Sequence, residues 1–518
     1  MTLPRFLALL TALAIAAGAC ARRQAAPDML VIASERDVEG LDPHTAGQVL
    51  QTQTVLANVY EGLVTFDPQM SLVPALALSW TNPDELTWDF QIRGAVPFQS
   101  GGLLEGDDVV FSLQRARDNP RSVLRGALAH VTEIRALAHD RVRVVTSRAD
   151  ASLISRLRQV FIVSRRFMAA NGEGALAARS AGTGPYRVAS RREGETIDLT
   201  RFDEYWRGTP AIPKARFVAR SFGEAALAAQ VPPTGRLLFR LKPGTPAAQA
   251  GENVRYATPG LGVQYLSFDL RRRTSPRVRL RAGQSGNPFL DGRVREAVAL
   301  VLDHPRLLRE AAGEDGFTPT QLVPPDVFGF DPSIAAPRRN RDEARRLMAS
   351  SDFAAGFDVE LDLRPLNTAM APALVRDLAE LGILVSPNIL PDKEFFGRLA
   401  SGDSSLCILR FFCWTGDAQK ILDDVFHSRD RSTGLGEFNF AYESNPVPGI
   451  DAEIEASRSA SAPAVRLNLL QQAMRRVVVS RLAIPLLQDK DVTYAPPDLE
   501  WTPREDGFRL VFEARFKG

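Results

Sequence analysis

Residues 358–414 alternate between two hydrophobic patterns, and this alternation restricts the possible folds more than any other feature of the chain. The stretch reads in order as strand, helix, strand, helix, strand: DVELDLR (358–364), PALVRDLAEL (372–381), ILVSPNIL (383–390), KEFFGRLAS (393–401) and LCILRFFCW (406–414). Short links between these elements leave the helices as crossovers between parallel strands. The sequence therefore predicts an α/β fold with a parallel layer in its C-terminal half.

Two charged residues follow strands of this predicted layer. Arg364 ends the first strand, and Asp417 lies just beyond the third. Because the carboxyl ends of parallel strands meet at one edge of a sheet, where ligands bind in such folds, both side chains are expected at that edge. They would clamp a zwitterion such as a short peptide with free ends. The alternatives are an ordinary ion pair or side chains that face solvent.

The cysteines Cys407 and Cys413 invite a redox, metal or disulfide interpretation. On one unbroken strand, six residues separate their backbones by about 20 Å, whereas a disulfide needs Cα atoms within about 7 Å. We therefore predict that both are packing residues. We find neither a catalytic motif nor a metal-ligand spacing among the five histidines, so we expect no enzyme activity, no cofactor and no bound metal.

The N-terminus resembles an export signal. Arg5 precedes an apolar run from Phe6 to Ala19, which is too short to span a membrane, and Cys20 follows directly. We predict a signal peptide over residues 1–19, lipid attachment at Cys20 and a linker over 20–28. Ordinary signal-peptidase cleavage after Ala19 is the alternative.

The size and charge of the chain further limit the number of lobes and the kinds of partner that we expect. With 518 residues it is expected to form two or three lobes. Lys and Arg number 63 against 61 Asp and Glu, so the protein has no net field that would attract nucleic acid or an anionic membrane surface. We expect a soluble exported body that contacts the membrane only through its N-terminal lipid.

Ten landmarks then occur in one order along the chain. They are LDPH (41–44), VYEGLVTFDP (59–68), LVPALALSW (72–80), WDFQIRGAVPFQSGG (88–102), DDVVFSLQRARD (107–118), GTGPYRV (182–188), FDEYWRG (202–208), NPFLDGRVREAVALVLD (287–303), RDEARRLM (341–348) and NFAYESNPVPGIDAEI (439–454). Together they resemble family 5 of the bacterial extracellular solute-binding proteins, the peptide and nickel receptors of ABC importers. The resemblance covers nearly the whole mature chain.

This resemblance implies a periplasmic-binding-protein-like fold (type II), with two main lobes joined by a hinge and a smaller inserted lobe. Lobe I would comprise residues 29–66, 182–264 and 485–518, lobe II residues 67–181, and lobe III residues 265–484. VQYLSFDL (263–270) and AIPLLQD (483–489) resemble the two hinge crossings.

The resemblance also implies a ligand site. WTGD (414–417) looks like a segment of the dipeptide and oligopeptide receptors, which makes Asp417 the anchor for a ligand ammonium and Trp414 a wall of the pocket. LRPLN (363–367) resembles the segment whose arginine, here Arg364, takes the ligand carboxylate. Proline residues usual after the aspartate are replaced by DAQKILDD, so Asp417 has an alternative role as the cap of a helix.

The function implied is that of a monomeric periplasmic receptor that hands short peptides to an ABC permease complex in the inner membrane. The same fold would also suit a nickel chelate, an opine or an oligosaccharide. From other classes, an exported hydrolase and a sensory receptor remain alternatives. Affinity in the micromolar range would require about −8 kcal/mol.

Overall fold

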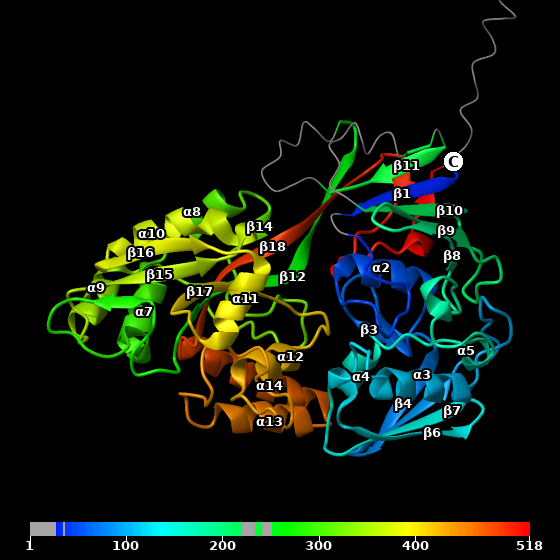
Figure 1. The fold of residues 1–518 in the computed structure, drawn as a ribbon, viewed down its shortest axis with the longest axis horizontal. Helices are drawn as coiled ribbons and strands as arrows, with labels where there is room; N and C mark the ends of the chain where they lie inside the picture. Colours follow the sequence, from blue (N-terminus) through cyan, green and yellow to red (C-terminus); the bar gives the residue numbers. More distant parts are fainter. Residues whose placement is uncertain (1–26, 35–36, 220–230, 233, 241–250, 518) are drawn as a thin grey trace, which may run out of the picture.

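The computed structural model describes residues 27–34, 37–219, 231–232, 234–240 and 251–517. The predicted signal peptide and Cys20 lie outside the described residues. Two halves stand side by side in Figure 1 and are joined by one pair of long strands, β12 (Val254–Phe268) and β18 (Ala483–Ala495). This arrangement confirms the predicted α/β fold of two main lobes, a hinge and a smaller inserted lobe.

Lobe III forms the C-terminal half around a seven-stranded sheet. Its strand order is β13-β15-β17-β12-β18-β14, with β16 on the outer side of β15. The strands other than β12 and β18 are β13 (Val278–Leu280), β14 (Gly316–Phe317), β15 (Phe357–Leu363), β16 (Ile383–Ile389) and β17 (Leu406–Phe412). Strand β15 pairs in parallel with both β16 and β17, so the predicted parallel layer is confirmed.

Helices cover this sheet and fill the lower part of lobe III. They are α7 (Gly292–Val301), α8 (His304–Ala311), α9 (Arg341–Ala349), α10 (Ala371–Ala379), α11 (Asp392–Ser401), α12 (Gln419–Ile421), α13 (Ile450–Ser459) and α14 (Pro463–Val479). Proline and glycine mark several ends: α14 begins at Pro463, and α11 is followed by Gly402 in the left-handed conformation. Helix α14 lies beside α13 on the side of lobe III that meets the other half (Figure 1).

Lobe I is built on a five-stranded sheet with the order β11-β1-β10-β9-β8. Its elements are β1 (Met29–Ser34), α2 (Leu50–Val59), β8 (Tyr186–Arg192), β9 (Thr196–Arg201), β10 (Lys214–Ala219) and β11 (Gly235–Leu238), followed near the C-terminus by β19 (Leu499–Glu500) and β20 (Arg515–Phe516). The chain's tail returns to this lobe, since Asn58 on α2 donates to the carbonyl of Arg509 and accepts from the amide of Val511.

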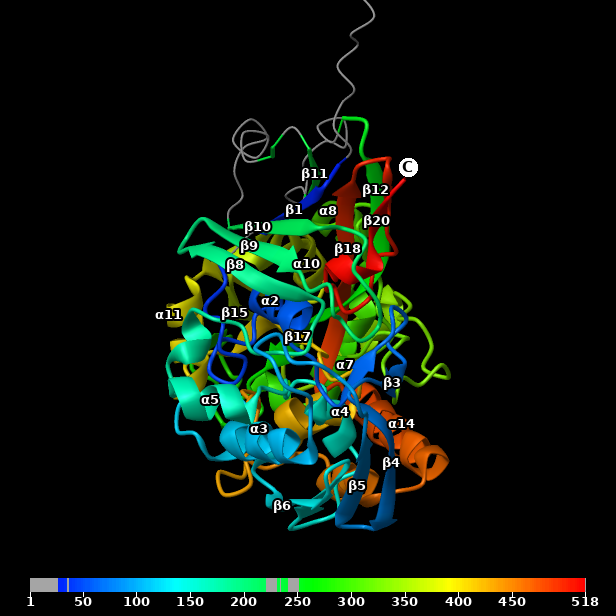
Figure 2. The ribbon, with the colours of Figure 1, turned by 90° about the vertical axis from the view of Figure 1, so that its right-hand side faces the viewer.

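Lobe II is a four-stranded antiparallel sheet with the order β4-β5-β7-β6. Its elements are β4 (Ala77–Asp84), β5 (Thr87–Ile92), α3 (Gly106–Asp118), β6 (Val131–Ala138), β7 (Arg141–Thr146), α4 (Leu153–Leu157) and α5 (Arg165–Asn171), and the hairpin β2 (Val64–Phe66) and β3 (Leu72–Pro74) leads into it. In Figure 2 this sheet and the sheet of lobe I lie at opposite ends of their half of the molecule. The exact domain boundaries stay predictions.

The hinge strands belong to both halves. At one end Val254 pairs with Ala495 beside lobe I, and at the other Ser267 pairs with Ala483 inside lobe III. Pairing is interrupted between Pro259 and Val263, where the register shifts. A bulge of this kind loosens the ladder between the lobes and gives the backbone a place to bend.

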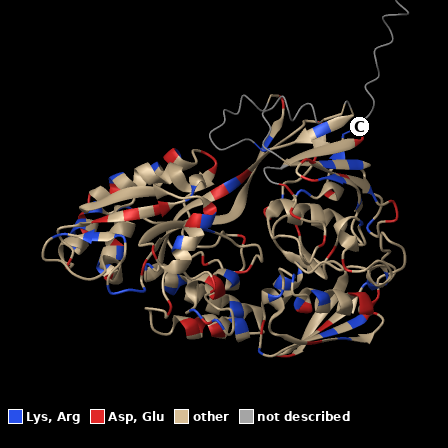
Figure 3. Ribbon diagram, viewed as in Figure 1, with Lys and Arg blue, Asp and Glu red and all other residues tan. Residues whose placement is uncertain are grey.

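The two halves touch in the structure. Phe66 and Met70, on the β2–β3 hairpin of the N-terminal half, are buried in the same apolar cluster as the core of lobe III. Basic and acidic residues are interspersed over both halves (Figure 3). No helix among the described residues combines the length and apolar content needed to cross a membrane.

Candidate functional site

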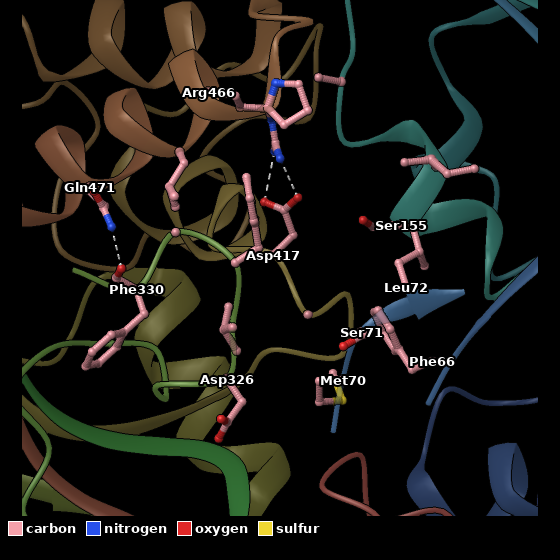
Figure 4. A pocket seen from close by; sticks show the side chains of 18 of the residues that line it. Phe66, Met70, Ser71, Leu72, Ser155, Asp326, Phe330, Asp417, Arg466 and Gln471 are labelled. Atoms are coloured by element: carbon pink, nitrogen blue, oxygen red, sulfur yellow. Dashed lines mark hydrogen bonds and ion pairs between the residues drawn. The ribbon is translucent and has the colours of Figure 1, made fainter. Parts of the chain in front are cut away.

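A cavity of about 880 Å³ lies between the N-terminal half and lobe III. The N-terminal half contributes Phe66, Gln69, Met70, Ser71, Leu72, Trp80, Thr81, Asn82, Trp88, Ala151, Ile154 and Ser155. Lobe III contributes Pro325, Asp326, Val327, Phe328, Gly329, Phe330, Pro332, Gly416, Asp417, Ser461, Pro463, Arg466, Leu467 and Gln471. Figure 4 shows residues of both halves facing each other across the opening. A concave, mainly apolar site with a few polar groups is typical of a small-molecule site.

Asp417 reaches the cavity because the chain turns sharply after β17. Gly416 adopts a φ of 62°, and Asp417 then pairs in parallel with Phe328 of the neighbouring loop. Its Oδ1 accepts a hydrogen bond of 2.9 Å from the amide of Gln419, the first residue of the short helix α12. Asp417 therefore lines the cavity, and its carboxylate also accepts a backbone hydrogen bond at the start of this short helix, whose N-cap position is Ala418.

The Asp417 carboxylate is also paired with a residue that the sequence did not single out. Arg466 on α14 binds it in a fork, with Nη1 at 2.7 Å from Oδ2 and Nη2 at 2.9 Å from Oδ1 (Figure 4). Only 6% of the Arg466 side chain and 5% of the Asp417 side chain are exposed. The Phe328 ring lies 5.3 Å from the guanidinium carbon. Arg466 has ordinary helical neighbours in sequence, so no motif could have identified it.

The charges around the cavity are few. Asp326, Asp417 and Arg466 are the charged residues in its lining. Since Arg466 neutralises Asp417, the remaining charge is that of Asp326, an exposed residue. Glu505, on the chain's tail, lies near Asp326, and burial together with this carboxylate raises the pKa of Glu505 to about 7.

The other two predicted ligand residues lie outside this lining. Trp414 packs against Phe412, with ring centroids 4.8 Å apart, and its carbonyl accepts a hydrogen bond of 3.3 Å from Arg158 of lobe II. Arg364 follows β15, forms an ion pair of 3.0 Å with Asp392 and lies over the Phe396 ring. The structure thus does not gather the predicted trio in one cavity, and their ligand contacts stay predictions.

The two cysteines are free and buried, which confirms that they form no disulfide with each other. Burial raises the pKa of each thiol to about 12. Such thiols are poor nucleophiles and poor metal ligands. Among the described residues, no group of three or more His, Cys, Asp or Glu side chains is placed to hold a metal ion.

Contacts between the halves surround the cavity. Arg158 of lobe II forms an ion pair of 3.0 Å with Asp506 of the tail, besides its hydrogen bond to lobe III. The amide of Ala151 donates to the carbonyl of Arg458 at 3.0 Å. The bonds from Arg158 and Ala151 to lobe III therefore link the two halves beside the cavity.

Comparison with known proteins finds relatives along most of the chain and solved structures with the same fold. The chain is 24% identical over 499 residues to the "Probable di/tripeptide-binding protein 5" of Pseudomonas aeruginosa, covering 89% of this chain and 90% of that protein. It is 23% identical over 425 residues to the "Dipeptide-binding protein" of Escherichia coli, covering 75% and 76%. The solved structure of the periplasmic binding protein DppA of Helicobacter pylori with the peptide STSA superimposes with a TM-score of 0.75 at 18% identity, covering 95% of this chain and 98% of that one.

HbpA2 of Haemophilus parasuis gives a TM-score of 0.80 at 17% identity, with 94% of this chain and 100% of that chain covered. Residues 71–433 match the family model for the middle region of the "Bacterial extracellular solute-binding proteins, family 5". The matched segment contains nearly all of lobe II, the middle segment of lobe I, most of lobe III and the turn that carries Asp417. The protein therefore belongs to family 5 of the bacterial extracellular solute-binding proteins.

Proposed function

We propose that the protein is the receptor component of an ABC importer that captures short peptides and delivers them to a membrane permease. The observation that carries this proposal is the cavity of about 880 Å³ between two halves joined by a pair of hinge strands. A volume of this order suits a ligand of two or three residues. Bending at the hinge would open the cavity to admit the ligand and then enclose it.

The named relatives support a peptide ligand over the alternatives. The matched Pseudomonas aeruginosa and Escherichia coli proteins are named for di- and tripeptides, and the Helicobacter pylori neighbour holds a peptide. These relatives are binding proteins and not enzymes by name. A transport role therefore accounts for the chain better than a hydrolase does.

The three predicted ligand residues have different roles in this proposal. Asp417 and the turn that carries it form the lobe III wall of the ligand site, and Trp414 supports that turn from outside the cavity. Arg364 would meet a ligand carboxylate only in a ligand that extends past the lining towards β15. We further propose export, lipid attachment at Cys20 and a monomeric receptor.

A screen of ligand classes tests this function. The purified protein is heated with di- and tripeptides, nickel chelates, opines and oligosaccharides, and each hit is measured by isothermal titration calorimetry. We expect a short peptide to raise the melting temperature and to bind with micromolar or tighter affinity. Binding of a nickel chelate or sugar together with the absence of any peptide hit would contradict the proposal.

A further inference from the structure

The Asp417–Arg466 pair fixes the kind of end group that can lie beside it. Asp417 is an acceptor with about four lone-pair sites, and three are used: two by Arg466 and one by the amide of Gln419. A ligand ammonium needs an unpaired acceptor of negative charge. The carboxylate at this point of the cavity is neither unpaired nor rich in free acceptor sites.

Arg466, in contrast to Asp417, has more hydrogen-bonding groups than the pair uses. A guanidinium carries five N–H donors, and among the described residues the side chain of Arg466 donates two hydrogen bonds, both to Asp417. Its Nε is buried and lacks a hydrogen-bond partner in the described structure. Besides this buried Nε–H, one N–H on each of Nη1 and Nη2 stays unused, and these donors suit a ligand oxygen.

Displacement of Arg466 by a ligand ammonium is unfavourable. The arginine side chain is 94% buried between Asp417 and the Phe328 ring, and leaving it there without its carboxylate would strand a buried charge. A ligand ammonium that entered without displacing it would lie beside a second cation. The rest of the lining is mostly apolar, with Phe66, Leu72 and Trp80 on the facing side, and its one other charged residue is the exposed Asp326.

From this geometry, and resting on the proposed function, we infer that the protein selects short apolar peptides whose amino end is blocked, such as N-acylated peptides. The acyl oxygen would accept a hydrogen bond from the Arg466 side of the pair, and the acyl chain would contact the apolar lining. Arg466 is then the residue that determines specificity. Without it, Asp417 would be a free carboxylate suited to an ammonium.

A matched pair of probes tests the inference on the full-length mature protein. Leu-Leu-amide and N-acetyl-Leu-Leu-amide differ only at the amino end, where an acetyl group replaces the charged ammonium by a neutral amide, and both are titrated by calorimetry. We expect the acetylated probe to bind at least about tenfold more tightly to the wild type, since it avoids an unpaired ammonium. Tighter binding of the free amine would overturn the inference and leave the peptide function standing. Failure of both probes and of all other peptides would overturn the proposed function itself.

Variants on helix α14 give the second part of the test. Arg466→Met leaves Asp417 unpaired and should reverse the preference, so that Leu-Leu-amide binds more tightly than the acetylated probe. Arg475→Met, on the same helix but outside the cavity lining, removes an ion pair with Asp331 and should leave the preference unchanged. The double variant Asp417→Asn with Arg466→Met has neither a free carboxylate nor the Arg466 donors and should weaken the preference for the acetylated probe without reversing it, which keeps the test decisive if the single variant does not fold. An unchanged preference in folded Arg466→Met would contradict the inference.

Discussion

Strands β15 and β17 are parallel neighbours in one mixed sheet, yet the residues that follow their carboxyl ends lie in different surroundings. Arg364 follows β15 and pairs with Asp392, whose side chain is 51% exposed. Asp417 follows β17 and pairs with Arg466, where both side chains are nearly fully buried. Both pairs join an arginine to an aspartate. Position at a sheet edge therefore does not by itself make a site.

The difference follows from the strand order. Strand β17 lies directly beside the hinge strand β12, whereas β15 lies one strand further out. The turn after β17 consequently meets the N-terminal half, and Gly416 lies against Phe66. In this protein the second half of the molecule, more than the sheet edge, creates the enclosed cavity.

The largest expected effect is on the free energy of unfolding when the arginine of the buried Asp417–Arg466 pair is removed. Arg466→Met strands the buried Asp417 carboxylate and is expected to lower the free energy of unfolding by about 3–5 kcal/mol. Denaturant titration followed by circular dichroism measures the loss. The double variant Asp417→Asn with Arg466→Met should recover most of it, because neither remaining group is charged. A single-variant loss below about 1 kcal/mol would mean that the buried pair does not differ from an exposed one.

The contact of Gly416 with the other half can be broken separately. A Cβ at this position would lie 2.7 Å from Cζ of Phe66 and 3.1 Å from Cε of Met70, and the backbone φ of 62° already disfavours a side chain. Gly416→Ala is therefore expected to cost about 1–3 kcal/mol. It should also weaken peptide binding, because the obstructed contact is the one made on closure.

A variant at a second glycine serves as a control that distinguishes the effect of backbone strain from the effect on closure of the cleft. Gly434 has a φ of 75° and open space around the position of a Cβ. Gly434→Ala should share the loss of stability from strain and leave peptide affinity unchanged. Equal affinities of the two alanine variants, measured by calorimetry, would show that Gly416 plays no part in closure.

At the end of β15 the expected effect is smaller. Arg364→Met removes an ion pair with a half-exposed partner and should change the free energy of unfolding by no more than about 1 kcal/mol. Binding of a peptide acid and the corresponding amide then tests the predicted carboxylate contact. A loss of affinity confined to the acid would support it, and unchanged binding of both would remove Arg364 from the ligand site.

The sequence was sufficient for the scaffold because that part of the fold rests on local patterns. Alternating apolar residues around Leu361 and the helix ended by Gly382 specify their elements locally, and short connections force the parallel order. Asp417 could be placed near the cavity because it follows such a strand. Arg466 could not, since its role arises from the packing of α14 against a loop about 50 residues earlier. Pairing between distant elements leaves no periodic signal in either one.

Glu505 and Asp326 are two carboxyl groups that lie near each other across the cleft. Their effect on stability and binding is expected to be smaller than that of the Asp417–Arg466 ion pair. Glu505 of the tail lies near Asp326 of lobe III, and its raised pKa of about 7, against an ordinary 4.5, means that the closed form holds a proton that the unfolded form releases above pH 4.5. The free energy of unfolding that this group contributes is therefore present at low pH and lost as the pH rises towards and through about 7. Opening the cleft separates the two carboxyl groups, so closure takes up a proton.

Peptide affinity should accordingly fall as the pH rises from about 5 to about 7 and level off above that, by less than about tenfold per pH unit, which is the limit for one linked proton. His44 and His304, whose pKa burial lowers to about 4, stay neutral over this range and do not contribute. Glu505→Gln should flatten the dependence measured by calorimetry, whereas Glu500→Gln on β19, where the side chain is 41% exposed, should preserve it. A slope that persists in Glu505→Gln would contradict the assignment to Glu505 and would mean that another group takes up the proton on closure.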